Sequence, residues 1–364
     1  MNAIQQLHAL GQSIWYDNIQ RELLQNGALA QMVAAGEIRG ITSNPSIFHS
    51  AIANSSDYDE ALQALSAGRV SSAAVYESLA IADIQAACDL FLPLYNETRG
   101  GDGYVSLEVS PYLAQDAEGT VADAARLWER VNRPNLMIKI PATREALPAI
   151  ARTIAAGINV NVTLIFAVSR YEAVMDAYMA GLEERLAAGE QIDRIASVAS
   201  FFVSRIDTAV DRHLEELGSE SALSLRGKIA IANAKVAYAR HKTVFSSERW
   251  EKLAAQGAQV QRALWASTST KNPAYSDTRY VDELIAPDTV NTVPPKTLAA
   301  FKDHGTAALT LEADLPAAYA ALDELAALGI SLDAIAQELE VQGVASFSKA
   351  FTALLNSIDD KLAH

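Results

Sequence analysis

Lys139 is a single cation inside the otherwise apolar run 136–142, and its chemistry is the first that the sequence suggests. Read as an extended strand, the run places Met137, Lys139 and Pro141 on one face and aliphatic residues on the other. Burial favours the neutral form of an amine, and a neutral amine attacks carbonyl carbons to form Schiff bases. The alternative is an ordinary lysine that reaches solvent at the strand end or pairs with Asp or Glu.

Two further β-like runs alternate polar and apolar residues. In the run 104–110, Glu108 would point toward the same interior as Lys139, where its carboxylate could pair with the lysine or relay protons through a water. In the run 159–166, Asn161 and Thr163 alternate with apolar residues and suggest hydrogen bonds to a polyol or a positioned water. The alternatives are a carboxylate on the rim and a polar layer that satisfies its own hydrogen bonds.

Three more candidate residues stand at the ends of β-like runs. Asp17 is a candidate general base or a helix cap. Asn44 is followed by a proline that keeps it extended, so its amide would be presented at the strand end, unless it only forms a turn. Arg205 begins a predicted helix, and an arginine at a helix N-terminus is suited to anions. The alternative for Arg205 is a surface pair with Asp207 or Asp211.

The segment 267–273 follows another β-like run and is rich in hydroxyl groups. Ser267 and Lys271 could complete a phosphate site there, because barrel enzymes often bind phosphate after their last strands. A solvated loop is the alternative. The six histidines show no paired spacing for metal ligands, so no metal site is predicted.

These residues lie in short β-like runs that alternate with helical patterns, which is typical of βα units and a parallel sheet. We therefore predict an α/β fold of the (β/α)8 TIM barrel type with additional helices. An open doubly wound sheet is the alternative, but neither Gly-x-Gly-x-x-Gly nor a Walker A sequence is present. The predicted strands are 13–17, 40–44, 104–110, 136–141, 159–166, 195–202, 260–267 and 290–294.

The whole chain, 1–364, is predicted to be one barrel domain with 306–364 as a C-terminal helical extension. One helix is expected before Gly343 and another, bearing Phe347 and Phe351, after it. These helices would pack on the barrel or on a partner subunit of a homo-oligomer.

Composition restricts the class of protein. Of the 364 residues, 50% are hydrophobic and 20% are charged, as in ordinary globular proteins. The formal net charge of −15 argues against non-specific nucleic-acid binding and against a basic membrane patch. The single cysteine, Cys88, allows no intrachain disulfide. No signal peptide and no run near the ~18 apolar residues of a membrane span are evident, so we predict a cytoplasmic protein.

Five short motifs, in order along the chain, resemble the transaldolase family. The resemblance is to its longer bacterial branch, related to the transaldolase part of transaldolase–phosphoglucose isomerase fusions. The motifs are ITSNPSIF at 41–48, LMIKIPA at 136–142, GINVNVTLIF at 157–166, SFFVSRID at 200–207 and WASTSTKNP at 265–273.

The resemblance implies a (β/α)8 barrel and a cofactor-free class I aldolase mechanism. Such an enzyme transfers a dihydroxyacetone unit between sugar phosphates of the pentose phosphate pathway, from sedoheptulose 7-phosphate to glyceraldehyde 3-phosphate. The alternatives are a lyase that cleaves fructose 6-phosphate and a non-catalytic barrel that binds sugar phosphates.

Residue by residue, the resemblance makes Lys139 the Schiff-base lysine and Asp17 the acid/base at the C4 hydroxyl. Glu108 and Thr163 would hold a catalytic water. The remaining residues would bind substrate: Asn44, Asn161 and Ser200 the dihydroxyacetone portion, and Arg205, Ser267 and Lys271 the phosphate. Lys271 is expected to replace an arginine that many relatives carry.

Overall fold

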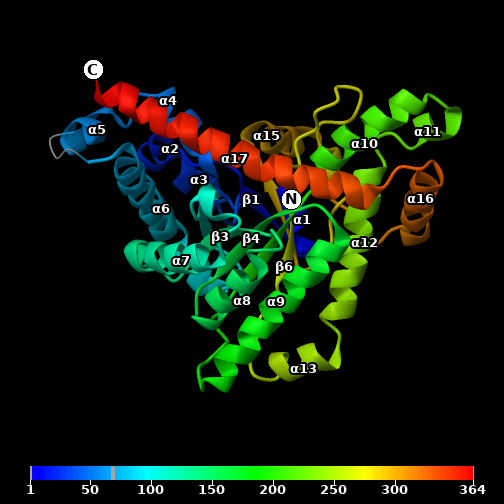
Figure 1. The fold of residues 1–364 in the computed structure, drawn as a ribbon, viewed down its shortest axis with the longest axis horizontal. Coiled ribbons are helices and arrows are strands. Elements are labelled where there is room, and N and C mark those ends of the chain that lie inside the picture. The colour runs from blue at the N-terminus through cyan, green and yellow to red at the C-terminus, as the bar shows by residue number, and fades with distance from the viewer. Residues whose placement is uncertain (1, 67–69, 364) are drawn as a thin grey trace.

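The computed structural model describes residues 2–66 and 70–363, and seven parallel strands in this part form one sheet (Figure 1). The strand order is β1-β7-β6-β5-β4-β3-β2, so strands consecutive in sequence from β2 to β7 are neighbours. Nearly every strand residue is buried, as expected for a parallel sheet covered by helices. The strands are β1 (Gln12–Tyr16), β2 (Val105–Glu108), β3 (Leu136–Pro141), β4 (Val160–Ile165), β5 (Ser197–Phe202), β6 (Arg262–Ala266) and β7 (Thr289–Val293).

Helices alternate with these strands, as predicted, and surround the sheet (Figure 1). Several begin at a side-chain cap: Ser71 accepts a hydrogen bond from the amide of Ala74, and Asp116 accepts one from Gly119. The helices are α1 (Ala3–Ala9), α2 (Arg21–Gln25), α3 (Ala28–Ala34), α4 (Pro45–Ala53), α5 (Asp59–Ser66), α6 (Ser72–Glu97), η1 (Pro111–Leu113), α7 (Ala117–Val131), α8 (Leu147–Ala155), α9 (Val168–Ala187), α10 (Ser204–Leu217), α11 (Glu220–Ser224), α12 (Ile229–Val244), α13 (Glu248–Ala254), α14 (Arg279–Asp282), α15 (Pro295–His304), α16 (Leu315–Ala327) and α17 (Leu332–Leu362).

Seven of the eight predicted strands are confirmed, with ends shifted by at most two residues. The prediction of a strand at 40–44 is wrong. Here Ile41 alone forms single parallel bridges, to Tyr16 of β1 and to Val105 of β2. The segment therefore stands between β1 and β2 without forming a strand.

Two local contacts shape this segment. Asn44 already caps α4, since its side chain accepts a hydrogen bond from the amide of Ile47, and the chain turns there. On the other side, Gly40 lies against Trp15 so closely that a Cβ at position 40 would come within 2.7 Å of the indole ring. The cap at Asn44 therefore ends the extended part, whereas Gly40 only permits the close approach to Trp15, since Arg39 and Gly40 still hydrogen-bond to β1.

Helix α6 has the length and composition to cross a membrane, which the sequence analysis did not anticipate. Half of its most apolar 18-residue stretch is buried in the protein. The buried Asp83 on α6 forms an ion pair of 2.8 Å with Arg21 and accepts a 2.8 Å hydrogen bond from the Tyr58 hydroxyl. These are the contacts of a helix packed within the core. Helices α16 and α17 are long and apolar enough to cross a membrane only if they are counted as one span, which would be bent by 89°.

Helix α17 crosses the molecule from α16 to α4 (red in Figure 1) and contacts α4, α5, α6, α10 and β4. The prediction of two helices separated at Gly343 is wrong, because α17 is one helix of 31 residues. Gly343 is buried in its middle, and a Cβ there would come within 2.9 Å of Cδ2 of Leu164 on β4. The glycine therefore permits close approach of the helix to the sheet and does not end the helix.

Candidate functional site

A cavity of about 230 Å³ lies at the carboxyl ends of the strands. Glu108 and Asn161 lie beside it, because Glu108 contacts Lys139 and Asn161 hydrogen-bonds to Ser200, two residues that line the cavity. The structure thus brings all ten predicted site residues together. The eight that line the cavity are Asp17, Asn44, Lys139, Thr163, Ser200, Arg205, Ser267 and Lys271.

Lys139 lies in β3 with its side chain only 6% exposed. Its Nζ donates a 3.2 Å hydrogen bond to the carbonyl of Ser43 and lies 3.5 Å from Oε2 of Glu108. The ring centroid of Phe347, from α17, is 5.5 Å from the same nitrogen. The predicted pairing of Lys139 with a carboxylate is confirmed, and the amine faces the cavity, not bulk solvent.

Glu108 ends β2 and is held opposite Lys139 by the register of β2 and β3. Burial raises the pKa of its carboxyl to about 7, an effect that the neighbouring Lys139 partly offsets and that the charge of Asp17 increases. Its Oε2 is buried and has no hydrogen bond within residues 2–66 and 70–363. A carboxyl group that titrates near neutral pH can both donate and accept a proton.

Asp17 follows β1 directly, and it is not a helix cap, because Gln20 stands at the N-cap of α2. Its Oδ1 accepts a 2.7 Å hydrogen bond from Oγ1 of Thr42. Burial raises the pKa of the Asp17 carboxyl, while Lys139, the Thr42 hydrogen bond and Lys271 oppose that rise. The helix-cap alternative for Asp17 is therefore wrong, and its role as a general base stays a prediction.

The polar residues of the run 159–166, which contains β4, divide into two parts. Asn159 is fully used by the sheet: its amide nitrogen donates to the carbonyls of Pro134 and Leu136, and its oxygen accepts from the amide of Ala196. The alternative of an internally satisfied polar layer is therefore correct for Asn159. Nearer the cavity, Asn161 donates to Oγ of Ser106 at 3.0 Å and accepts from Oγ of Ser200 at 2.7 Å.

Thr163 lies where β4 departs from regular pairing. The register with β5 shifts between Val162 and Ile165, and Leu164 has a left-handed backbone with φ +61°. Such an irregularity redirects side chains. The Oγ1 atom of Thr163 is buried without a hydrogen bond in the described part of the chain. Together with Oε2 of Glu108, it gives the site two buried polar atoms available to a water or a substrate.

Arg205 lies in the first turn of α10, and it forms no ion pair with any described residue. The predicted alternative of a pair with Asp207 or Asp211 is wrong. Asp207 instead accepts hydrogen bonds from the Ala230 amide and the Tyr280 hydroxyl. Asp211 is likewise held by Gly227 and Tyr275. The guanidinium of Arg205 thus faces the cavity with its charge uncompensated.

Two further groups extend this positive region. Ser267 adopts a left-handed backbone with φ +55°, and its Oγ lies 3.0 Å from Oγ of Ser204. Lys271 donates a 2.5 Å hydrogen bond to Oγ of Ser269 and lines the cavity. Two cations and several hydroxyl groups at one end of a cavity suit a phosphate group.

Asn44 combines both roles considered for it. It is extended, with φ −158°, as the following proline predicts, and its Oδ1 accepts a 3.0 Å hydrogen bond from the amide of Ile47. Its oxygen is therefore used in capping α4, while the residue also lines the cavity.

Several residues of the site were missed by sequence reasoning. Thr42 binds Asp17, Ser43 offers its carbonyl to Lys139, and Ser106 binds Asn161. Alternation in the strand-like runs could have identified Ser106, and the proximity of Thr42 and Ser43 to Asn44 was a signal for them. Phe347 had no such signal, because nothing in the sequence places α17 over the strands.

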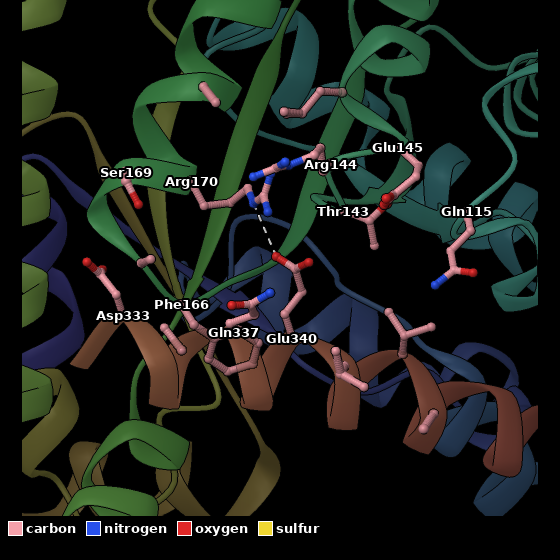
Figure 2. A pocket seen from close by; sticks show the side chains of 17 residues that line it. Gln115, Thr143, Arg144, Glu145, Phe166, Ser169, Arg170, Asp333, Gln337 and Glu340 are labelled. Atoms are coloured by element: carbon pink, nitrogen blue, oxygen red, sulfur yellow. Dashed lines mark hydrogen bonds and ion pairs between the residues drawn. The ribbon is translucent and has the colours of Figure 1, made fainter. Parts of the chain in front are cut away.

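A larger groove, of about 960 Å³, lies between α17 and the first turns of α8 and α9 (Figure 2). Arg170 of α9 reaches across it to Glu340 of α17 at 3.1 Å. None of the ten predicted residues lines this groove. We place the candidate site in the smaller cavity, although the groove is larger, because the buried lysine and two acids meet at that cavity.

Nearly the whole chain is similar to known proteins. The family model described as Transaldolase/Fructose-6-phosphate aldolase matches residues 14–358. A protein named Transaldolase from Parafrankia sp. (strain EAN1pec) is 51% identical over 98% of this chain and 97% of its own length. Another with that name, from Trichodesmium erythraeum (strain IMS101), is 47% identical over 99% and 98%. A third, from Thermobifida fusca (strain YX), is 50% identical over 99% and 98%.

Proposed function

This chain belongs to the transaldolase/fructose-6-phosphate aldolase family, and we propose that it transfers a dihydroxyacetone unit between sugar phosphates through a Schiff base on Lys139. The observation that carries the proposal is the buried Lys139 amine, 3.5 Å from Glu108 on the adjacent strand. It lines a cavity that also holds Asp17 and an uncompensated Arg205. No metal or organic cofactor is needed for this chemistry.

We also propose that the sheet is a (β/α)8 barrel in which Ile41 takes the place of the eighth strand. Its bridges to β1 and β2 support closure of the ring. The proposal of one domain over 1–364, with 306–364 as its helical extension, is supported by the packing of α17 on α4 and β4. A cytoplasmic location and a homo-oligomer stay predictions.

In the proposed first step, the neutral amine of Lys139 attacks the carbonyl carbon of the donor sugar. The carbinolamine then loses water to become an iminium ion. Both events need protons moved to and from oxygen and nitrogen. Glu108 and Thr163 have buried oxygens without hydrogen bonds in the described part of the chain, so a water bound to them would serve as the proton carrier.

In the second step, Asp17 takes the proton of the C4 hydroxyl as the bond between C3 and C4 breaks. The electron pair of that bond moves into the iminium, which becomes an enamine, and an aldose phosphate leaves. The Thr42 hydrogen bond fixes the carboxylate of Asp17 for this role. Transfer is completed when the enamine attacks the aldehyde carbon of an acceptor and the steps run in reverse.

Substrate positioning follows from the remaining groups. Ser200 and Asn161, already joined to each other, would bind hydroxyls of the dihydroxyacetone portion, together with Asn44. Arg205 would bind the phosphate, with Lys271 and Ser267 beside it. The donor and acceptor we propose are sedoheptulose 7-phosphate and glyceraldehyde 3-phosphate, which would yield erythrose 4-phosphate and fructose 6-phosphate in the pentose phosphate pathway.

The second candidate is a lyase that cleaves fructose 6-phosphate, because the family that matches this chain includes such aldolases. The lyase would use the same lysine but release free dihydroxyacetone. A third candidate, a non-catalytic barrel that binds sugar phosphates, would have no use for a buried lysine beside two buried acids.

Borohydride trapping tests the proposal directly. The protein is incubated with fructose 6-phosphate and sodium borohydride, and tryptic peptides are examined by mass spectrometry. We expect a reduced adduct on Lys139 and none in Lys139→Met. No adduct, or an adduct on another lysine such as Lys228, would overturn the assignment.

Adding erythrose 4-phosphate separates the two enzymes. Formation of sedoheptulose 7-phosphate far in excess of free dihydroxyacetone supports transfer. Release of dihydroxyacetone at the rate of transfer supports the lyase.

A further inference from the structure

Phe347 is the only described residue C-terminal to Pro294 that lines the catalytic cavity. Its side chain comes from α17, and the residue is 5% exposed. The ring centroid lies 5.5 Å from Nζ of Lys139. An aromatic face at this distance attracts a cation and covers it from one side.

The depth of Phe347 in the site is fixed by its neighbours on the same face of α17. One turn earlier, Gly343 lies on Leu164 of β4, where no Cβ would fit without displacement. One turn later, the ring of Phe351 meets Tyr76 and Tyr112 edge-on, with centroids 5.4 and 5.5 Å apart. The ring over the lysine is therefore held between two specific contacts.

Both ends of α17 are also tied down. Near its start, Glu340 pairs with Arg170 at 3.1 Å across the groove (Figure 2). Near its end, Lys361 donates 2.7 Å hydrogen bonds to Asp59 and to the carbonyl of Ser55. These contacts tie the helix across the site, and Phe347 forms part of the cavity wall in this structure.

In the proposed mechanism, hydrolysis of the Schiff base competes with transfer. After the donor is cleaved, the enamine can be protonated on carbon to give the iminium of dihydroxyacetone. Water then adds its oxygen to the iminium carbon, which is the carbon bonded to the lysine nitrogen, the carbon–nitrogen bond breaks, and the two protons of the water pass to nitrogen. Free dihydroxyacetone and the lysine ammonium result, and the transfer is lost.

We propose that Phe347 determines the ratio of transfer to hydrolysis, by covering the Lys139 Schiff base so that water reaches it slowly. This inference rests on the proposed Schiff base and extends it to a residue of the last helix. The ring also stabilises the positive charge of the iminium. Gly343 acts as a positioning residue, because it sets how closely the ring approaches the nitrogen.

The test measures free dihydroxyacetone released per sedoheptulose 7-phosphate formed, from fructose 6-phosphate with erythrose 4-phosphate as acceptor. We expect Phe347→Ala to raise this ratio on the order of tenfold, because water then reaches the Schiff base from the side that the ring covers. Phe347→Leu keeps most of the apolar volume and should raise it less. Gly343→Val keeps the ring but lifts α17 from Leu164, and the ratio should rise again.

Val341→Ala is the matched control, since it truncates an exposed apolar side chain of the same helix outside the cavity and should leave the ratio unchanged. Borohydride trapping on Lys139 is run for every variant. An adduct with an unchanged ratio in Phe347→Leu and Gly343→Val would overturn the role of Phe347 while leaving the function intact. Absence of an adduct in the wild-type protein would instead overturn the proposed function.

Discussion

Glu108 and Lys139 are cross-strand partners, with Oε2 of the acid 3.5 Å from Nζ of the lysine. Both side chains are 6% exposed, so their interaction is little screened by water. Because two adjacent strands of a buried sheet fix their separation, the pair is a rigid feature of the protein. The carboxyl with its pKa of about 7 can then exchange a proton at neutral pH without movement of the backbone.

The first prediction concerns stability against pH. Burial raises the pKa of Glu108 from 4.5 to about 7, so between these values the folded protein holds a proton that the unfolded chain releases. Stability must therefore fall as pH rises through this range, by about 3 kcal/mol from this group. Glu108→Gln should remove this part of the decrease in the free energy of unfolding, which is measured by urea denaturation between pH 4.5 and 7.5. Glu248→Gln, which changes only a surface pair with Lys252, is the control and should retain it.

The second prediction concerns Schiff-base formation. If Glu108 moves protons in forming and dehydrating the carbinolamine, Glu108→Gln should slow the appearance of the borohydride-trapped adduct by about 10²–10⁴-fold. Quenched-flow trapping with fructose 6-phosphate measures this rate. Adduct formation at the wild-type rate would count against the role.

The third prediction separates Asp17 from that step. Asp17→Asn should still form the adduct on Lys139, yet transfer should fall by at least about 10²-fold, because no base takes the C4 hydroxyl proton. Thr42→Val removes only the hydrogen bond that orients Asp17 and should have a smaller effect. Loss of both adduct and transfer in Asp17→Asn would place Asp17 in the first step instead.

Most of the sheet could be predicted from sequence because a buried parallel strand is a short apolar run ended by a turn or helix. The same alternation placed Glu108 and Thr163 inward. The segment around Ile41 resembled a strand equally well, but the cap formed by Asn44 competes with pairing there and ends it. Local patterns therefore predicted which residues face the interior better than how far each strand extends.

The last helix illustrates what local patterns cannot supply. Gly343 is a common sign of a helix end, yet here it serves a contact with Leu164, which is distant in sequence. Phe347 was expected on the buried face of a helix, and it is buried. That it is buried against Lys139 depends on where α17 crosses the strands, which is a property of tertiary packing alone.

The fourth prediction concerns recognition of phosphate. Arg205 has no ion-pair partner in the described part of the chain, so its charge is available to the substrate. A charge-assisted hydrogen bond contributes about 1.5–3 kcal/mol, so Arg205→Gln should lower kcat/KM for fructose 6-phosphate by roughly 10–100-fold. Most of the change should appear in KM, since the reacting carbons are elsewhere.

Unphosphorylated fructose provides the decisive comparison for Arg205. The wild-type protein should use it poorly, and Arg205→Gln should use it no worse, because the interaction removed is one that fructose never makes. Lys271→Gln should give a smaller loss with fructose 6-phosphate, since Lys271 is exposed and already hydrogen-bonded to Ser269. An equal loss with both sugars in Arg205→Gln would mean that the arginine maintains the shape of the cavity and does not bind phosphate.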